Sequence, residues 1–235
     1  MKDGGCAVEA SSARRYSVGA ALVVCAVALW TVGMARHGYL YADDFLYQSI
    51  ASKAPFTWST FFADTFDHFF PGLWAWFFVS SRLAPFNYNW HLFLIAVLLA
   101  ATLFLIWRVV ARIAGVRWLS LLFVAALGLS SLCVPTWYFV SSAVNLLPTQ
   151  FAGALAALAL LRGLQDGARD SALLGVVAVA LGLSFWEKAG LIPVLLLGVT
   201  VVIPQAWDGQ TWKQRLSATR FFWLAQGALL LLYVI

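Results

Sequence analysis

Residues Trp90–Val110, WHLFLIAVLLAATLFLIWRVV, form a long apolar run in which Arg108 is the only charged residue. About 20 consecutive apolar residues suffice for a helix to cross a lipid bilayer. Outer-membrane barrel strands alternate apolar and polar residues instead. Comparable unbroken blocks recur along the chain at Ser17–Ala35, Trp118–Val134, Leu147–Leu161, Ala172–Trp186, Ala189–Ile203 and Phe221–Ile235. The sequence therefore predicts an all-α, polytopic transmembrane helix bundle.

The composition supports this class. Of the 235 residues, 63% are hydrophobic and 11% are charged, whereas a soluble domain is about 45–50% apolar and about 25% charged. Disorder is excluded because it requires low hydrophobicity and high charge. The net charge of +5 comes from Lys and Arg in short loops, so we interpret it as topological and expect no nucleic-acid partner. The three cysteines have neither CxxC nor Cys/His metal spacing.

The basic residues also predict the topology, because Lys and Arg accumulate in cytoplasmic loops. Four basic clusters become cytoplasmic if the short block Phe69–Ala84 does not cross fully. These clusters hold 11 of the 15 basic residues: Lys2, Arg14 and Arg15; Arg108, Arg112 and Arg117; Arg162 and Arg169; Lys213, Arg215 and Arg220. The block has 16 residues, about 24 Å of helix against a core of about 30 Å. We expect seven full spans plus one short or re-entrant segment; eight crossings is the alternative.

This topology predicts a cytoplasmic tail over residues 1–16 and a single transmembrane domain over residues 17–235, with an outer loop at residues 37–70. The protein is expected in the plasma (inner) membrane, with its N-terminus in the cytoplasm and its active face outside. The chain stops within an apolar block at Ile235. We therefore expect a fragment of a longer protein, and the chain alone is expected to lack part of a complete site.

The first outer loop carries an acidic pair, Asp43-Asp44, just past the end of the first span. Adjacent carboxylates repel each other, which raises one pKa and suits a general base. A carboxylate pair also suits a divalent cation such as Mg²⁺ or Mn²⁺. The alternative interpretation is a solvated turn or a helix N-cap, a position that Asp favours.

Two further outer segments carry polar and aromatic residues. Residues 58–70 have helical apolar spacing, which predicts an aromatic helix lying flat in the interface with Asp64, Asp67 and His68 on its polar face. These side chains could bind a metal ion or ligand, or form a solvated face. Trp137 and Tyr138 supply aromatic rings to a second segment, where such rings also occur simply as interface anchors.

The third outer segment places Glu187 and Lys188 between two apolar blocks with almost no loop. One interpretation is a salt bridge or snorkelling to the lipid headgroups. The other is a cation for the phosphate of a lipid carrier.

Together these motifs resemble the membrane glycosyltransferases of the GT-C superfamily, in particular the protein-mannosyltransferase and aminoarabinose-transferase types. The resemblance spans roughly Tyr16 to Pro204. It rests on an N-terminal span, the Asp43-Asp44 pair in the first outer loop, the His68-Phe-Phe-Pro71 entry to the next block and the Glu187-Lys188 hairpin. Family members usually have more spans and often a soluble C-terminal domain.

The resemblance implies a sugar transfer from a polyprenyl-phosphate carrier to a glycan, lipid or protein of the cell envelope, on the outer face of the lipid bilayer. It implies that Asp43 or Asp44 is the general base, with Asp44 preferred, and that Lys188 contacts the phosphate of the carrier. Glu187, Asp67, His68, Trp137 and Tyr138 would line the site. No cofactor is certain; any divalent cation would lie at Asp43, Asp44 and His68. The alternatives are a transporter or lipid flippase and a non-catalytic assembly protein.

Overall fold

The computed structural model describes residues 4–62, 69–115, 118–130, 139–168, 170–202 and 209–234, and side chains from Arg15 onward. Helices dominate these residues, and no strand occurs among them. They are α1 (Gly4–Ala35), α2 (Asp43–Lys53), α3 (Trp58–Phe61), α4 (Pro71–Leu83), α5 (Tyr88–Ala114), α6 (Trp118–Gly128), α8 (Val140–Asp166), α9 (Ser171–Phe185), the 3₁₀ helix η2 (Glu187–Gly190), α10 (Leu191–Val202), α11 (Trp212–Ala218) and α12 (Arg220–Val234).

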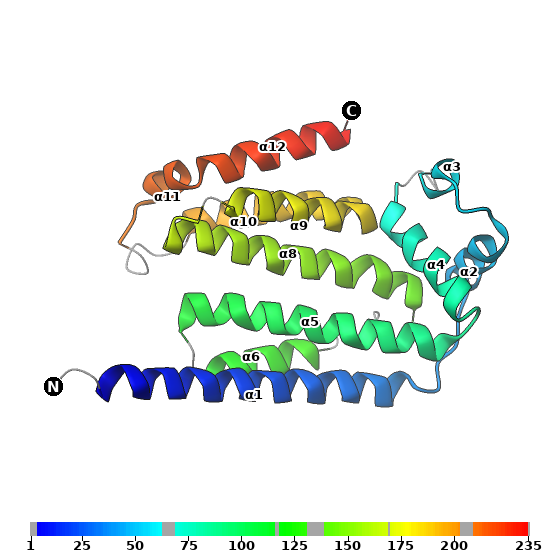
Figure 1. The fold of residues 1–235 in the computed structure, drawn as a ribbon, viewed down its shortest axis with the longest axis horizontal. Helices are drawn as coiled ribbons and strands as arrows, with labels where there is room; N and C mark the ends of the chain where they lie inside the picture. The colour runs from blue at the N-terminus through cyan, green and yellow to red at the C-terminus, as the bar shows by residue number, and fades with distance from the viewer. Residues whose placement is uncertain are drawn as a thin grey trace.

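The long helices lie side by side, and the short helices α2, α3 and α4 gather at one end of them (Figure 1). Arg15–Ala35 of α1, α5 and α8 are long and apolar enough to cross a membrane. The α11–α12 pair is a fourth candidate, although it bends by 71° between Ala218 and Arg220. These helices are consistent with an integral membrane protein. The described helices α6 and α9 are apolar but shorter, so the seven or eight crossings remain a prediction.

Local sequence signals explain where several helices begin and end. Asn87 accepts a hydrogen bond from the Trp90 backbone N–H at 3.2 Å and so caps the start of α5. Gly167 adopts a left-handed backbone (φ 62°) after α8, and its N–H bonds to the Arg162 carbonyl. A left-handed residue of this kind is a common helix stop. The helix α1 starts at Gly4, so part of the predicted tail belongs to the first helix.

Helix α8 is the centre of the bundle, because it packs against α5 on one side and α9 on the other. Its α9 face is rich in alanine. A Cβ on Gly182 of α9 would lie 3.0 Å from the Ala152 Cβ and 2.9 Å from the Ala189 Cβ. Small residues at helix interfaces let backbones approach closely inside membranes, where packing replaces the hydrophobic effect between helices.

Helix α4 corresponds to the short block Phe69–Ala84 of the sequence. Its 13 residues span only about 20 Å at 1.5 Å per residue, which is less than the bilayer core of about 30 Å. It lies at the same end of the bundle as α2 and α3 (Figure 1). The shape of α4 therefore fits the short segment that the topology requires.

The structure describes residues 58–62, 69 and 70 of the flat aromatic helix predicted over residues 58–70. Helix α3 begins at the Thr57 cap and ends at Phe61. Its aromatic rings stack on their neighbours: Trp58 lies 5.6 Å from Phe62, and Phe62 lies 5.6 Å from Phe69, between ring centroids. These described rings pack against one another, and residues 63–68 of the predicted helix lie outside the described part of the chain.

Candidate functional site

The two aspartates of the acidic pair occupy different environments at the start of α2. Asp44 is fully buried, whereas Asp43 is exposed. Ala42, just before them, has φ 41°, a left-handed value that is costly for a residue with a Cβ. This turn sets the direction in which α2 leaves the first span, and with it the separation of the two carboxylates.

Asp44 binds the first backbone N–H groups of α8. Its Oδ1 accepts from the Ser141 N–H at 2.6 Å, and its Oδ2 accepts from the Val140 N–H at 3.1 Å. The first N–H groups of a helix lack partners within the helix, and a carboxylate there is stabilised by the helix dipole. Asp44 is therefore an N-cap supplied to α8 by a helix almost 100 residues earlier in the chain.

Asp43 lies in the first turn of α2 and is the solvent-accessible member of the pair. One helical turn later, Tyr47 is buried against Trp74 and Phe77 of α4, with ring centroids 5.6 and 5.3 Å away. Burial raises the pKa of the Tyr47 phenol, and the nearby Asp43 carboxylate raises it further. A neutral phenol thus lies beside the exposed carboxylate.

Helix α2 is fixed at its other end by Arg82 of α4. The Arg82 guanidinium donates to the Ala51 carbonyl at 2.6 Å and to the Ala54 carbonyl at 3.1 Å. Carbonyl groups in the last turn of a helix have no partner within it, and an arginine can satisfy them. Together, Asp44 and Arg82 hold α2 at both ends and so fix the place of Asp43.

Lys188 and Glu187 lie on η2, where the chain turns from α9 into α10. Lys188 is exposed, and its Nζ lies 4.4 Å from the ring centroid of Trp186, within range of a cation–π interaction. Glu187 is partly buried.

Helix α4 reaches this turn as well. A Cβ on Gly72 would lie 2.7 Å from the Phe185 ring and 2.8 Å from the Ser184 carbonyl oxygen. The acidic pair and the Lys188 turn thus belong to one end of the bundle (Figure 1), joined through α4.

Several predicted site residues lie outside the described part of the chain: Asp64, Asp67, His68, Trp137 and Tyr138. Their relation to Asp43 and Lys188 is therefore still a prediction. Within the described ranges, no three His, Cys, Asp or Glu side chains lie close enough to hold a metal ion. Because Asp43 and Asp44 lie in different environments, a cation shared by the two has no support there.

Two buried polar residues near the acidic pair were not predicted as part of the site. His91, at the start of α5, accepts a hydrogen bond at Nδ1 from Trp76 Nε1 at 3.0 Å, and its Nε2 has no partner among the described residues. Neither amide atom of Gln48 has one either. Buried polar groups of this kind are usually satisfied by water or a ligand. Gln48 follows Asp44 by one helical turn, and this spacing was the available signal. For His91 the signal was its place at the outer end of the apolar block Trp90–Val110.

No protein-family model, curated protein sequence or solved structure matches the chain. The fold and the site define its class as a helical protein suited to a membrane. One end of the bundle carries an exposed carboxylate, an exposed cation and a buried polar layer.

Proposed function

We propose that the protein is the membrane part of a glycosyltransferase that moves a sugar from a polyprenyl-phosphate carrier to an acceptor of the cell envelope. The site lies at the α2–α4 end of the bundle, on the outer side of the plasma membrane. Asp43 is the general base and Lys188 is the contact for the carrier phosphate.

One observation supports this proposal most directly. An exposed carboxylate and an exposed ammonium lie at the same end of the bundle (Figure 1). Asp44 and Arg82 fix α2, and the contact of Gly72 with Phe185 fixes α4 against the turn that carries Lys188. A site on rigid elements keeps its reacting groups in place.

The geometry favours Asp43 over Asp44 as the base, reversing the preference at the sequence level. A general base must come within hydrogen-bond reach of the proton that it removes. Asp44 is enclosed and already accepts three backbone hydrogen bonds, from Tyr41, Val140 and Ser141. Asp43 is open to solvent, so an acceptor hydroxyl can reach it.

The reaction follows from these roles. The acceptor oxygen attacks the anomeric carbon as Asp43 takes the hydroxyl proton. The bond between the anomeric carbon and the phosphate oxygen breaks, and its electron pair leaves with the carrier phosphate. Lys188 stabilises the charge that grows on this phosphate, the kind of stabilisation that is often the largest part of catalysis. In this proposal, Asp67, His68, Trp137, Tyr138 and Glu187 line the substrate-binding space.

The test is transfer from polyprenyl-phosphate-linked sugars to envelope acceptors by the intact protein in proteoliposomes. Asp43→Asn should lower the transfer rate by about 100-fold or more, the usual contribution of a general base. Lys188→Gln should weaken use of the carrier. Asp170→Asn is the matched control, because Asp170 is an exposed carboxylate at the opposite end of the bundle.

Unchanged transfer by Asp43→Asn, with the protein correctly inserted, would refute the proposal. Movement of the labelled carrier across the bilayer without a new glycosidic product would indicate a flippase instead.

A further inference from the structure

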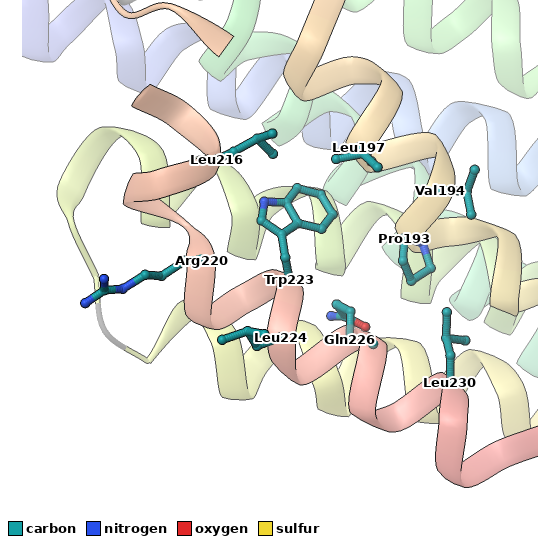
Figure 2. Close-up of a pocket in the computed structure, with 10 residues that line it drawn as sticks. Pro193, Val194, Leu197, Leu216, Arg220, Trp223, Leu224, Gln226 and Leu230 are labelled. Carbon is teal, nitrogen blue, oxygen red and sulfur yellow. The ribbon is translucent and has the colours of Figure 1, made fainter. Parts of the chain in front are cut away.

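A long groove separates α10 from α12, far along the chain from the acidic pair. Its volume is about 560 Å³, within the range of about 300–1,000 Å³ typical of ligand sites. Figure 2 shows its lining, mostly apolar: Pro193, Val194, Leu197, Leu216, Trp223 and Leu230. From Arg220 to Leu230 the groove follows ten residues of α12, about 15 Å of helix. The elongated groove therefore suits an extended ligand chain better than a compact solute.

The groove exists because α12 packs on α9 rather than on α10. Gly175 of α9 admits the Phe222 ring, which a Cβ there would overlap. On the groove side, Gly227 has no atom within 4 Å of where its Cβ would lie. The floor is therefore open at Gly227 even though the neighbouring helices are tightly packed.

The α11 end of the groove is basic. Arg220 lies on its rim with its guanidinium directed outward, away from Trp223 (Figure 2). Lys213 is exposed on the adjoining α11, with its Nζ 5.4 Å from the Trp212 ring centroid. No acidic residue follows Gly209 in the sequence. Asp166 and Asp170, at the same end of the bundle, pair with Arg112 and Arg162 at 3.3 Å. The charge at this rim thus attracts anions.

The groove runs along α12, which belongs to the candidate span α11–α12. Its apolar lining suits the acyl chain of a phospholipid, and the cations at one end suit the headgroup. Trp belongs at the membrane–water interface, and basic pockets between membrane helices bind anionic headgroups. Because α11 and α12 meet at a bend of 71°, α11 would run along the bilayer surface when α12 enters the bilayer.

We infer that this groove is a binding site for an anionic glycerophospholipid. One acyl chain lies along α12 between Trp223 and Leu230, and the phosphate lies against Arg220 and Lys213. The site is independent of the proposed glycosyl transfer, because its basic end lies at α11, at the opposite end of the bundle from α2 and α4 (Figure 1).

The test is lipid retention by the full chain, purified in a mild detergent and measured by native mass spectrometry. The probes are phosphatidylglycerol and phosphatidylcholine with the same acyl chains. Phosphatidylglycerol should be retained preferentially. Removing each cation with Arg220→Gln and Lys213→Gln should reduce this preference about fivefold, the effect of about 1 kcal/mol per basic residue near an anionic lipid. Lys53→Gln, an exposed cation on α2, should leave it unchanged.

A second pair of variants tests the groove itself. Gly227→Leu places a side chain in the open floor and should reduce retention of both lipids. Gly198→Leu is its control, because Gly198 of α10 also has open space around it but does not line the groove. Equal retention of the two lipids by the wild type, or unchanged retention by Gly227→Leu, would overturn the inference. The inference would also be overturned if a polyprenyl phosphate displaced phosphatidylglycerol from the groove, or if a second copy of the chain occupied the groove.

Discussion

At the scale of single residues, the acidic pair shows that two adjacent aspartates can have different structural roles. Asp43 and Asp44 are identical in sequence and adjacent, yet one is exposed and the other is fully buried. The sequence raised helix capping as an alternative for this pair, and capping is what Asp44 does. The helix that it caps is α8 rather than its own α2, and no local pattern could reveal a contact across almost 100 residues.

The cap role predicts a stability effect that differs within the pair. Asp44→Ala leaves the Val140 and Ser141 N–H groups without their acceptor, which should cost about 2 kcal/mol of unfolding free energy. Asp44→Asn keeps one acceptor oxygen and should cost less. Asp43→Ala should cost little, because Asp43 is exposed. Thermal unfolding in detergent measures all three, and equal losses for the Asp44 and Asp43 alanine variants would contradict the cap role.

At the scale of elements, α4 connects the two halves of the candidate site. It binds α2 through Arg82 and the Tyr47 ring packing, α5 through the Trp76–His91 hydrogen bond, and α9 through Gly72. Pro71 begins the helix, a position where its missing N–H costs nothing. A helix of only 13 residues therefore organises one end of the bundle.

The close approach at Gly72 predicts that any larger residue is destabilising. A Cβ there would lie 2.8 Å from a backbone oxygen of α9, so Gly72→Val must push α4 away from the Lys188 turn. Overpacking of this kind typically costs about 1–3 kcal/mol.

Gly33→Val is the matched control, because Gly33 of α1 has nothing within 4 Å of its Cβ position. A lower unfolding midpoint for Gly72→Val alone is expected, and equal midpoints would show that α4 does not rest on α9.

At the scale of the whole molecule, the two ends of the bundle differ in character. The α2–α4 end carries Asp43 and the aromatic cluster, and the opposite end carries Arg112, Arg162 and the basic α11 (Figure 1). This asymmetry agrees with the positive-inside argument from sequence, and it predicts that the α2–α4 end faces outward.

Cysteine labelling tests this orientation. In a background with Cys6, Cys25 and Cys133 replaced, Ser59→Cys should react with an impermeant thiol reagent applied outside intact cells. Ala168→Cys, in the turn after α8, should react only after the membrane is permeabilised. The reverse pattern would invert the topology and place Asp43 in the cytoplasm.

The sequence alone was enough to predict the helical class and the approximate place of the long helices. It did not predict α2, which lies in the expected outer loop, or α11. The apolar block Trp90–Val110 became α5, Tyr88–Ala114, and the block Ser17–Ala35 lies within α1. Long apolar runs are reliable signals because the bilayer core demands both the length and the absence of charge. Boundaries were less predictable: α8 begins at Val140, before its apolar block, because Asp44 supplies its cap from another helix.

Three features follow from tertiary contacts and could not be predicted: which aspartate is accessible, how α2 is held at both ends and where the groove lies. Each of these depends on pairs of residues far apart in sequence, such as Asp44 with Ser141 or Arg82 with Ala51. The hydrophobic pattern fixes which segments enter the membrane, since that depends on transfer from water. The contacts between segments depend on side-chain shape and on the pairing of buried polar groups, which a one-dimensional pattern does not contain.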